Sequence, residues 1–473
     1  MSADPAGADT DDTSHTPTSG RLGPNYFKLF GASTISNLGD GIGVLAYPWL
    51  ASAITRNPLL IALVAVVQRL PWLMFSLPAG VVTDRMSRRT LMIRANATRF
   101  VITLGVAFLV LSRQDALPGP DALSTGAAEA VDDMVLYVLI LVATLLLGVA
   151  EVFYDNAAQT YMPAVVHTDD LERANGRLWS IERVANEFVG PPLGSFLLAI
   201  TFALPFFVDA VTFAASAALV ALIPSSVRRT TPTATATSAA TSATFAGEPT
   251  PSWRTELKEG FGWLWRHPLL RPMAVVLGML NAIAAMSFAI FVLFAQEVLG
   301  TSPTEFALVS TGGAVGGIIG GWTASWIAKK IGTGPSLALT MLGGGAATAT
   351  IGLLSSWPLV WLLFGFEMLL GTLWNVITVS LRQSIIPDRL LGRVNSVYRF
   401  FGWGMIPIGS GLGGIIVAIA DAAGSREFAL RLPWFVAGGM YFVLFAFAAP
   451  KLTTAKIEAA REAGANPDGQ PSD

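Results

Sequence analysis

The sequence predicts an all-α integral membrane protein with twelve transmembrane helices, arranged as two parallel halves of six helices each. Three observations predict this fold. Hydrophobic residues make up 53% of the 473 residues and charged residues only 13%, against about 25% charged residues in soluble domains. Apolar runs long enough to cross the ~30 Å core of a bilayer recur along the chain. The second half of the sequence repeats patterns found in the first.

The individual spans can be counted from these apolar runs. Each is close to the roughly 20 residues that a bilayer span requires, and the longer runs are accommodated by tilt or by interfacial turns. An even number of spans places both termini on the same side of the membrane. We place the spans at 28–54, 58–82, 91–112, 134–158, 177–200, 202–224, 268–296, 304–328, 335–355, 358–382, 396–420 and 432–450.

Basic residues indicate which side of the membrane each connection faces. They fall in alternate connections, whereas the intervening connections carry several acids. The positive-inside rule therefore predicts a multi-pass protein of the cell (plasma or inner) membrane with both termini in the cytoplasm. The basic residues that decide this are Arg85, Arg88, Arg89, Arg173, Arg177, Arg228, Arg229, Arg254, Lys258, Lys329, Lys330, Arg389, Arg393, Lys451 and Lys456.

Composition divides the chain into domains. Residues 1–24 are rich in Asp, Thr, Pro and Gly without an apolar segment, so we expect a disordered cytoplasmic tail and no signal peptide. The N-terminal six-helix half occupies 25–226, and the Ala/Thr/Ser/Pro-rich segment 227–252 predicts a flexible cytoplasmic linker. The C-terminal half occupies 267–451, followed by a cytoplasmic tail at 452–473.

The segment 253–266 stands between the linker and the C-terminal half. Trp253, Leu257, Phe261 and Leu264 follow one another at helical spacing, with charged residues between them. This pattern predicts an amphipathic helix lying on the inner membrane face. A soluble cap over the membrane domain fits the same pattern.

The two halves share a motif after the fourth span of each. In the first half, 159–163 (QTYMP) is followed by 171–176 (LERANG). In the second half, 383–387 (QSIIP) is followed by 391–396 (LGRVNS). Equivalent positions in the two halves predict parallel repeats with a substrate cavity at their interface.

A compact charged loop joins the second and third spans. Its spacing, Gly-x-x-x-Asp-Arg-x-x-Arg-Arg, resembles the signature loop of the major facilitator superfamily, and the resemblance extends from about Tyr26 to Pro450. Taken alone, the arginines could be a topology signal, although the aspartate serves no topological purpose. The resemblance implies a gating loop that holds the halves together at the cytoplasmic face in the outward-open state. Its residues are Gly80, Asp84, Arg85, Arg88 and Arg89.

Further stretches indicate a branch of this superfamily. Residues 39–41 (GDG), 69–72 (RLPW) and 151–156 (EVFYDN) resemble the bacterial branch that holds macrolide-efflux and enterobactin-exporter relatives. In the fifth span, 190–195 (GPPLGS) resembles the end of the antiporter motif of exporters, although Ser195 and the upstream Asn186 depart from it. The same residues also fit close helix packing or a kink. The motif residues are Gly190, Pro191, Pro192 and Gly194.

Charged residues inside the spans are costly in hydrocarbon, so they usually face a cavity or a partner. At about 1.5 Å per residue, Asp40 lies roughly 21 Å and Arg69 roughly 16 Å below the outer ends of neighbouring spans. We therefore expect Asp40 and Arg69 to pair near the midplane, either as a structural ion pair or as a proton-switchable one. Asn37 lies one turn from Asp40 and could join the network.

Other acids extend the predicted charge network. Glu151 lies roughly 25 Å from the outer end of its span, and Asp155 lies one turn lower, so we expect Asp155 to approach the cytoplasmic interface. Arg183 and Glu187 stand at i and i+4, so they can pair on one helix face. Burial changes the proton affinity of a carboxyl group, so acids gathered in the first half suit proton coupling there. Glu367 is the deep acid of the second half.

The spans are rich in aromatic residues. Many aromatics with few fixed charges suit a bulky amphipathic compound, uncharged or cationic, better than a sugar. Each aromatic also fits packing or contact with lipid. The candidates for the substrate cavity are Asn37, Tyr47, Phe153, Phe188, Glu367 and Trp374.

We predict a secondary transporter that works as a monomer and exports lipophilic compounds such as drugs or macrolides against inward proton flow. A siderophore or metabolite exporter, a proton-coupled importer, and a non-transporting receptor or assembly protein remain alternatives. Zero cysteines and three histidines leave almost no ligands for metals and no nucleophile–base pair, so we expect no enzyme, metal or cofactor. The net charge of −2 gives no reason to expect a nucleic-acid partner.

Overall fold

The computed structural model describes residues 22–124, 130–224 and 253–465. The elements within these ranges are helical, in agreement with the predicted fold class, and no strand occurs among them. The predicted linker 227–252 and nearly all of the predicted tail 1–24 lie outside the described residues.

The N-terminal half begins with three long helices. Helices α2 and α3 begin at side-chain caps, because Asn57 accepts a hydrogen bond from the Leu59 amide and Ser87 accepts one from the Thr90 amide. The elements of this half are α1 (Pro24–Ile54), α2 (Pro58–Arg85), α3 (Arg88–Ser112), α4 (Pro120–Ser124), α5 (Met134–Val165), η1 (Thr168–Asp170), α6 (Leu171–Arg183), the π-helical η2 (Val184–Val189), α7 (Gly190–Ile200) and α8 (Leu204–Ala221).

The C-terminal half repeats this plan. Its second long helix begins at a capping box, in which Ser302 and Glu305 satisfy each other's backbone amides. The elements of this half are α10 (Trp253–Arg266), α11 (Leu270–Phe288), α12 (Phe291–Glu297), α13 (Pro303–Ile331), α14 (Thr333–Leu353), α15 (Trp357–Ile385), α16 (Asp388–Ala422), α17 (Arg426–Ala448) and α18 (Thr454–Ala465).

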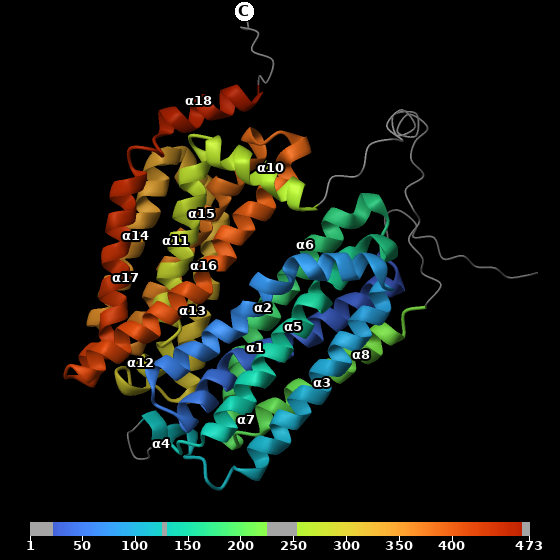
Figure 1. The fold of residues 1–473 in the computed structure, drawn as a ribbon, viewed down its shortest axis with the longest axis vertical. Helices are drawn as coiled ribbons and strands as arrows, with labels where there is room; N and C mark the ends of the chain where they lie inside the picture. The colour runs from blue at the N-terminus through green and yellow to red at the C-terminus, as the bar shows by residue number, and fades with distance from the viewer. Residues whose placement is uncertain (1–21, 125–129, 225–252, 466–473) are drawn as a thin grey trace, which may run out of the picture.

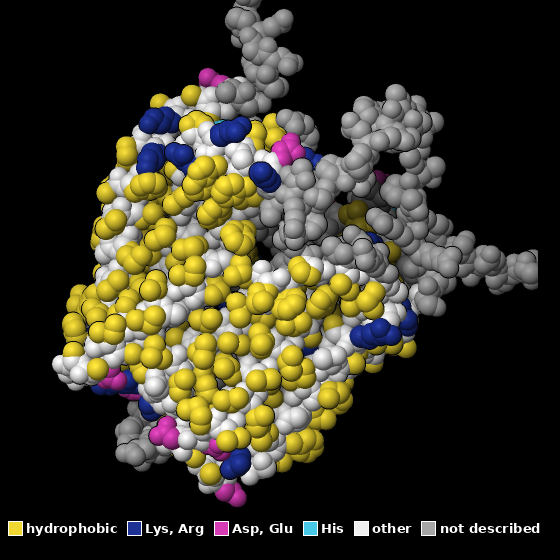
Figure 2. Space-filling view, in the orientation of Figure 1, with side chains coloured by type: hydrophobic (Ala, Val, Ile, Leu, Met, Phe, Trp, Pro, Cys, Tyr) yellow, Lys and Arg dark blue, Asp and Glu magenta, His cyan; other side chains and the backbone are white. Residues whose placement is uncertain are grey.

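Among the described residues, 10 helical segments are long and apolar enough to cross a membrane. The other two predicted spans, 28–54 and 177–200, are helical as well. The first corresponds to α1, whose centre contains the polar residues Ser33, Asn37 and Asp40. The second is divided into α6, η2 and α7, each too short to span a bilayer alone. Figure 2 shows hydrophobic side chains over the visible face of both halves, with charged side chains gathered towards the ends.

Helix contacts confirm that the halves are parallel repeats. In the N-terminal half α2 packs on α5, α3 packs on α8, and α1 packs on α7. The equivalent pairs in the C-terminal half are α13 with α15, α14 with α17, and α11 with α16. Figure 1 shows the two bundles side by side, with the N-terminal half in blue to green and the C-terminal half in yellow to red.

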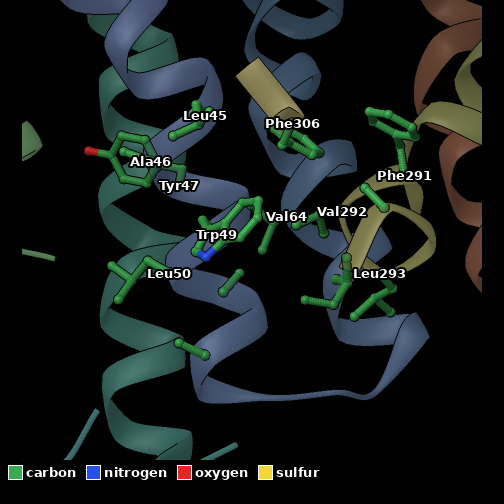
Figure 3. Packing of buried hydrophobic residues seen from close by; sticks show 14 of the residues in the cluster. Leu45, Ala46, Tyr47, Trp49, Leu50, Val64, Phe291, Val292, Leu293 and Phe306 are labelled. Carbon is green, nitrogen blue, oxygen red and sulfur yellow. The ribbon is translucent and has the colours of Figure 1, made fainter. Parts of the chain in front are cut away.

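The halves touch mainly through α2 with α16 and α7 with α13, and η2 adds a smaller contact with α13. At the predicted outer end, where the α1–α2 and α12–α13 connections lie, α12 also contacts α1 and α4. There Trp49 of α1 packs edge-on against Phe306 of α13, with ring centroids 5.3 Å apart. Phe291 lies in the same cluster (Figure 3). At the opposite end α6 and α10 stand apart (Figure 1).

Two short helices cover the C-terminal half at that opposite end. The predicted helix at 253–266 is present as α10, which packs on α16 with Leu264 fully buried. Glu259 of α10 forms an ion pair with Arg393 of α16. Within the predicted tail 452–473, α18 packs on α14 and α15 and buries Ile457 in the core of this half.

Candidate transport site

An ion pair lies halfway along the first helix. Arg99 of α3 donates through Nη2 to Oδ1 of Asp40, and through Nη1 to Oγ of Ser36 at 3.1 Å. The guanidinium carbon also lies 3.9 Å from the ring centroid of Phe213 in α8. The Arg99 side chain is only 3% exposed and that of Asp40 is 24% exposed. Three helices therefore hold this pair in place.

This pairing corrects the prediction that Asp40 binds Arg69. The Arg69 side chain is exposed on α2, and Asp40 pairs with Arg99. Depth along a helix places two residues at one height, but it does not say which neighbour each side chain faces. The sequence analysis overlooked Arg99, although an arginine inside the predicted span 91–112 is itself a signal, because such a charge needs a partner in hydrocarbon.

Glycines on either side of Asp40 let two other elements approach α1 closely. A Cβ atom at Gly41 would lie 2.8 Å from the carbonyl oxygen of Asn186 in η2 and 2.9 Å from the Cα of Gly190 in α7. A Cβ atom at Gly39 would collide with the side chains of Asp209 and Thr212 in α8. The stretch 39–41 is thus the point where α1 touches its neighbours backbone to backbone, with Asp40 between them.

A cavity of about 50 Å³ adjoins the ion pair inside the N-terminal half. That volume holds roughly three or four water molecules, and it is far below the roughly 300–1,000 Å³ of a pocket for a drug-sized ligand. It therefore suits water and protons and excludes a bulky compound. Its lining residues are Asp40, Gly43, Tyr47, Gln68, Arg99, Thr144, Leu147, Gly148, Glu151, Asp209 and Phe213.

Several carboxyl groups share the single guanidinium at this site. Arg99 interacts electrostatically with Asp40, Glu151, Asp209 and Asp155. The expectation that Asp155 approaches the cytoplasmic interface is corrected, because α5 continues to Val165 and Asp155 lies roughly 15 Å inside that helix end.

One more acid extends this group towards the fifth span. Glu182 of α6 is half-buried and interacts with Asp155. The sequence analysis did not single out this residue. Glu182 could have been identified from the sequence, because it is an acid inside the predicted span 177–200, directly before Arg183 of the predicted Arg183–Glu187 pair.

The antiporter-like motif lies against α1. Gly190 meets Gly41, and a Cβ atom at Gly194 would lie 3.0 Å from the carbonyl oxygen of Ile42. The neighbouring Pro191 is buried and Pro192 is half-buried. Both glycines are therefore needed for close packing between α1 and α7.

Both departures from the motif are explained by hydrogen bonds. Asn186 donates to Oδ1 of Asn37 at 3.0 Å, and Ser195 donates to Oγ1 of Thr304 in the other half at 3.2 Å. Asn37 itself donates to the Ser33 carbonyl within α1, and its bond from Asn186 connects α1 to η2. Neither bond involves Asp40, whose partner is Arg99. The side chain of Glu187 lies outside the described part of the chain, so its predicted pairing with Arg183 stays a prediction.

Arg88 and Arg89 of the predicted gating loop bind backbone carbonyls near helix ends in their own half. Arg88 donates to the Thr160 carbonyl of α5 at 2.7 Å. Arg89 donates to the Ile223 and Ala221 carbonyls at the end of α8, at 2.6 and 2.5 Å. Cations placed at helix C-termini satisfy free carbonyls and the helix dipole. Gly80, Asp84 and Arg85 complete α2, and their side chains lie outside the described residues.

The aromatic and acidic cavity candidates are spread over different environments. Tyr47 is buried beside the small cavity and packs edge-on against Phe206, with the two ring centroids 5.0 Å apart. Phe153 and Phe188 are half-buried. Trp374 is 3% exposed within the core of the C-terminal half. Glu367 of α15 accepts a hydrogen bond from Thr348 of α14. The last two therefore lie within one half, which corrects their assignment to a cavity between the halves.

Comparison with known proteins agrees with this architecture. A family model described as "Major Facilitator Superfamily" matches residues 29–409. The chain belongs to this superfamily. It is therefore a multi-pass membrane transporter and not an enzyme, as the sequence predicted.

Among its relatives in the superfamily is "Multidrug efflux pump Tap" of Mycolicibacterium fortuitum, which is 25% identical over 89% of this chain and 95% of its own length. Solved structures share the superfamily fold. One is titled "Crystal structure of a bacterial homologue of iron transporter ferroportin in inward-facing state", with a TM-score of 0.66, 15% identity, and coverage of 90% of this chain and 98% of that chain. Another, titled "Crystal structure of nucleoside transporter NupG", has a TM-score of 0.62 at 12% identity, covering 91% of this chain and 99% of its own.

In this member of the superfamily, a polar network joins the halves at the predicted outer end. Arg426 of α17 donates to both carboxylate oxygens of Glu297, at 2.9 and 3.2 Å, and to the Arg56 carbonyl at 2.8 Å. Arg56 donates to the side-chain oxygen of Gln296, and the Gln296 amide nitrogen donates to Oγ of Ser52 at 2.9 Å. The Nε atom of Arg56 lies 3.5 Å from Oε1 of Glu297. We call Arg56, Gln296, Glu297 and Arg426 the outer network.

Proposed function

We propose that the protein is a proton-coupled antiporter that exports bulky lipophilic compounds, such as drugs or macrolides, by alternating access. The observation that carries this proposal is the Asp40–Arg99 pair, surrounded by further carboxyl groups beside a small cavity in the N-terminal half. The relative named as a multidrug efflux pump supports the direction of transport and the class of substrate.

The charge balance of the site supports proton coupling. Asp40, Glu151, Asp155 and Asp209 outnumber the single guanidinium of Arg99. Charges without partners are costly in a membrane interior, so the excess carboxyl groups give protons a place to bind. Protonation of Asp40 removes one side of the ion pair and frees Arg99 to turn towards its other acidic neighbours. Because Asp40 lies where α1 touches α7 and α8, this change alters the contacts of α1.

The packing of the halves supports alternating access. They are joined by the outer network at one end and part at the end that carries α6 and α10 (Figure 1). With the sidedness that the basic loops predict, this arrangement would be a state open to the cytoplasm. The bulky compound would enter between the halves, because the cavity beside Asp40 is too small for it. Closing the cytoplasmic end would bring the loop that contains Asp84 to the seam.

Everted membrane vesicles test this function with ethidium as the probe. We expect vesicles containing the protein to accumulate ethidium when their lumen is acidic, and to release it when the proton gradient is collapsed. The variants D40N and E151Q should lose the pH dependence of transport, whereas E458Q, on the exposed face of α18, should retain it. The proposal would be contradicted if both D40N and E151Q kept the pH dependence of the wild type. Ethidium accumulation that stayed the same after the proton gradient was collapsed would contradict it as well.

A further inference from the structure

The exposed guanidinium of Arg69 needs an explanation now that Asp40 is paired elsewhere. Arg69 lies roughly 16 Å from the outer end of α2, at the depth of the hydrocarbon core. Its side chain is exposed, and it makes no hydrogen bond or ion pair with the described residues. An arginine that faced lipid at this depth would cost about 2.5–3.5 kcal/mol or more. Arg69 is therefore expected to face a polar route.

Helix contacts show which way this part of α2 faces. Gly414 of α16 packs against Ala62, and Gly404 of α16 lies opposite Leu73, whose Cδ1 would be 3.2 Å from a Cβ atom there. Arg69 lies two turns after Ala62 and one turn before Leu73, on the same stripe of the helix. The stripe that faces α5 is a different one, since Pro71 packs against Gly148. Arg69 thus lies at the seam between the two halves.

Two indole rings lie at the seam one helical turn beyond Arg69. Trp72, one turn further along α2, stacks on Trp403 of α16, with ring centroids 5.8 Å apart and planes at 25°. Trp403 remains 44% exposed. A guanidinium fork binds carboxylate or sulfonate oxygens in two parallel hydrogen bonds, and indole faces stack on planar apolar rings. Together these groups match an organic anion that carries a planar ring system.

We propose that Arg69, Trp72 and Trp403 form a binding site for the acidic end of the transported compound, so that amphipathic organic anions are substrates. This inference rests on the proposed export function and adds organic anions to its substrate class, beside the uncharged and cationic compounds that the few fixed charges of the spans favour. The acidic cavity beside Asp40 does not compete for the compound, since it is too small to hold it.

Two dyes with the same xanthene ring system and opposite charge test the site. Fluorescein carries a carboxylate, whereas in rhodamine 123 that group is esterified and the dye is a cation. We expect the purified wild-type protein to bind fluorescein more tightly, as measured by fluorescence anisotropy. R69Q should weaken fluorescein binding about tenfold, by losing a charged hydrogen-bond donor, and should leave rhodamine 123 binding unchanged or stronger. R69K should retain part of the fluorescein affinity, and W403L should weaken both dyes.

The matched control is R94Q, which removes an exposed arginine from α3, a helix that packs on α5 and α8 of its own half. It should change neither dye. Equal losses for both dyes in R69Q, or no loss for fluorescein, would overturn the site. Transport of both dyes into everted vesicles separates the two proposals. If rhodamine 123 is exported but fluorescein does not bind, the anion site alone is wrong. If fluorescein binds in an Arg69-dependent manner but the proton gradient drives transport of neither dye, the export function alone is wrong.

Discussion

Arg99 of α3 binds Asp40 of α1 from a position that is almost completely buried, while Asp40 keeps 24% of its side chain exposed. The two partners are therefore not equivalent. Asp40 depends on Arg99 as its cation, whereas Arg99 has Glu151 and Asp209 as further acidic neighbours.

This asymmetry predicts unequal effects of removing either partner. R99Q leaves several buried carboxyl groups without a cation and should lower the free energy of unfolding by about 3–5 kcal/mol. D40N keeps a hydrogen-bonding side chain and leaves Arg99 beside other acids, so it should cost about 1 kcal/mol. Melting of the purified protein in detergent, followed by tryptophan fluorescence, measures both. R94Q, on the same helix as Arg99, is the control for loss of an arginine. A melting point for D40N at or below that of R99Q would show that the asymmetry is absent.

The sequence predicted much of the fold because the apolar runs, the basic loops and the repeated motifs are each local patterns. It also identified Asp40, Glu151 and the glycines of the fifth span. It paired Asp40 with the wrong arginine, because residue counting gives depth along a helix and leaves rotation undetermined. Rotation is set here by backbone contacts, such as Gly41 against Gly190, which depend on the packing of both helices. The assignment of Trp374 to a cavity between the halves was wrong for the same reason. A tryptophan buried inside one half and a tryptophan facing the other half have similar neighbours in the sequence.

The contact between Gly41 and Gly190 should be sensitive to a single methyl group. A Cβ atom at Gly41 would lie 2.8 and 2.9 Å from two backbone carbonyl oxygens of η2, which cannot move as a flexible side chain can. G41A and G190A should each destabilise the protein by about 1–3 kcal/mol through overpacking, and should slow transport because α1 and α7 are pushed apart. The control is G105A on α3, where a Cβ atom meets nothing within 4 Å. Wild-type melting and transport in G41A would show that this contact is not tight.

The outer network should stabilise the state in which the outer ends are closed. The chain has no native cysteine, so introduced thiols can report on this state without background. Ser195 and Thr304 lie on opposite halves with their hydroxyl oxygens 3.2 Å apart. The double variant S195C/T304C should therefore crosslink readily under oxidising conditions, and the crosslink should stop transport reversibly.

Adding E297Q to that double variant removes the carboxylate that binds Arg426. We expect crosslinking to slow several-fold, because the closed outer end is less populated when a bidentate charged contact is lost. E427Q serves as the control, since Glu427 pairs with Arg431 on its own helix. Faster or unchanged crosslinking with E297Q would mean that the outer network does not hold this end closed.

His267 links α10 to α11 and predicts a local pH dependence. Its Nδ1 accepts hydrogen bonds from the Leu269 and Leu270 amides, both at 3.2 Å, and so caps the start of α11. Burial lowers the pKa of His267 below its ordinary value. The folded state thus binds this proton less readily than the unfolded state, so the stability from the cap is present above the ordinary pKa of about 6.5 and is lost as pH falls through the lowered value.

Hydrogen exchange of the peptide that contains Leu269 and Leu270, corrected for intrinsic rates, measures this cap. In the wild type we expect exchange to become about fivefold faster as pH is lowered through this range, because a cap contributes about 1 kcal/mol. H267N should keep protection at every pH, since an asparagine side chain can accept the same bonds and does not titrate there. H267A should exchange fast throughout. If the wild type and H267N showed the same pH profile, the imidazole would not be the titrating cap, and the junction of α10 and α11 would be held by the burial of Leu264 and Leu270 alone.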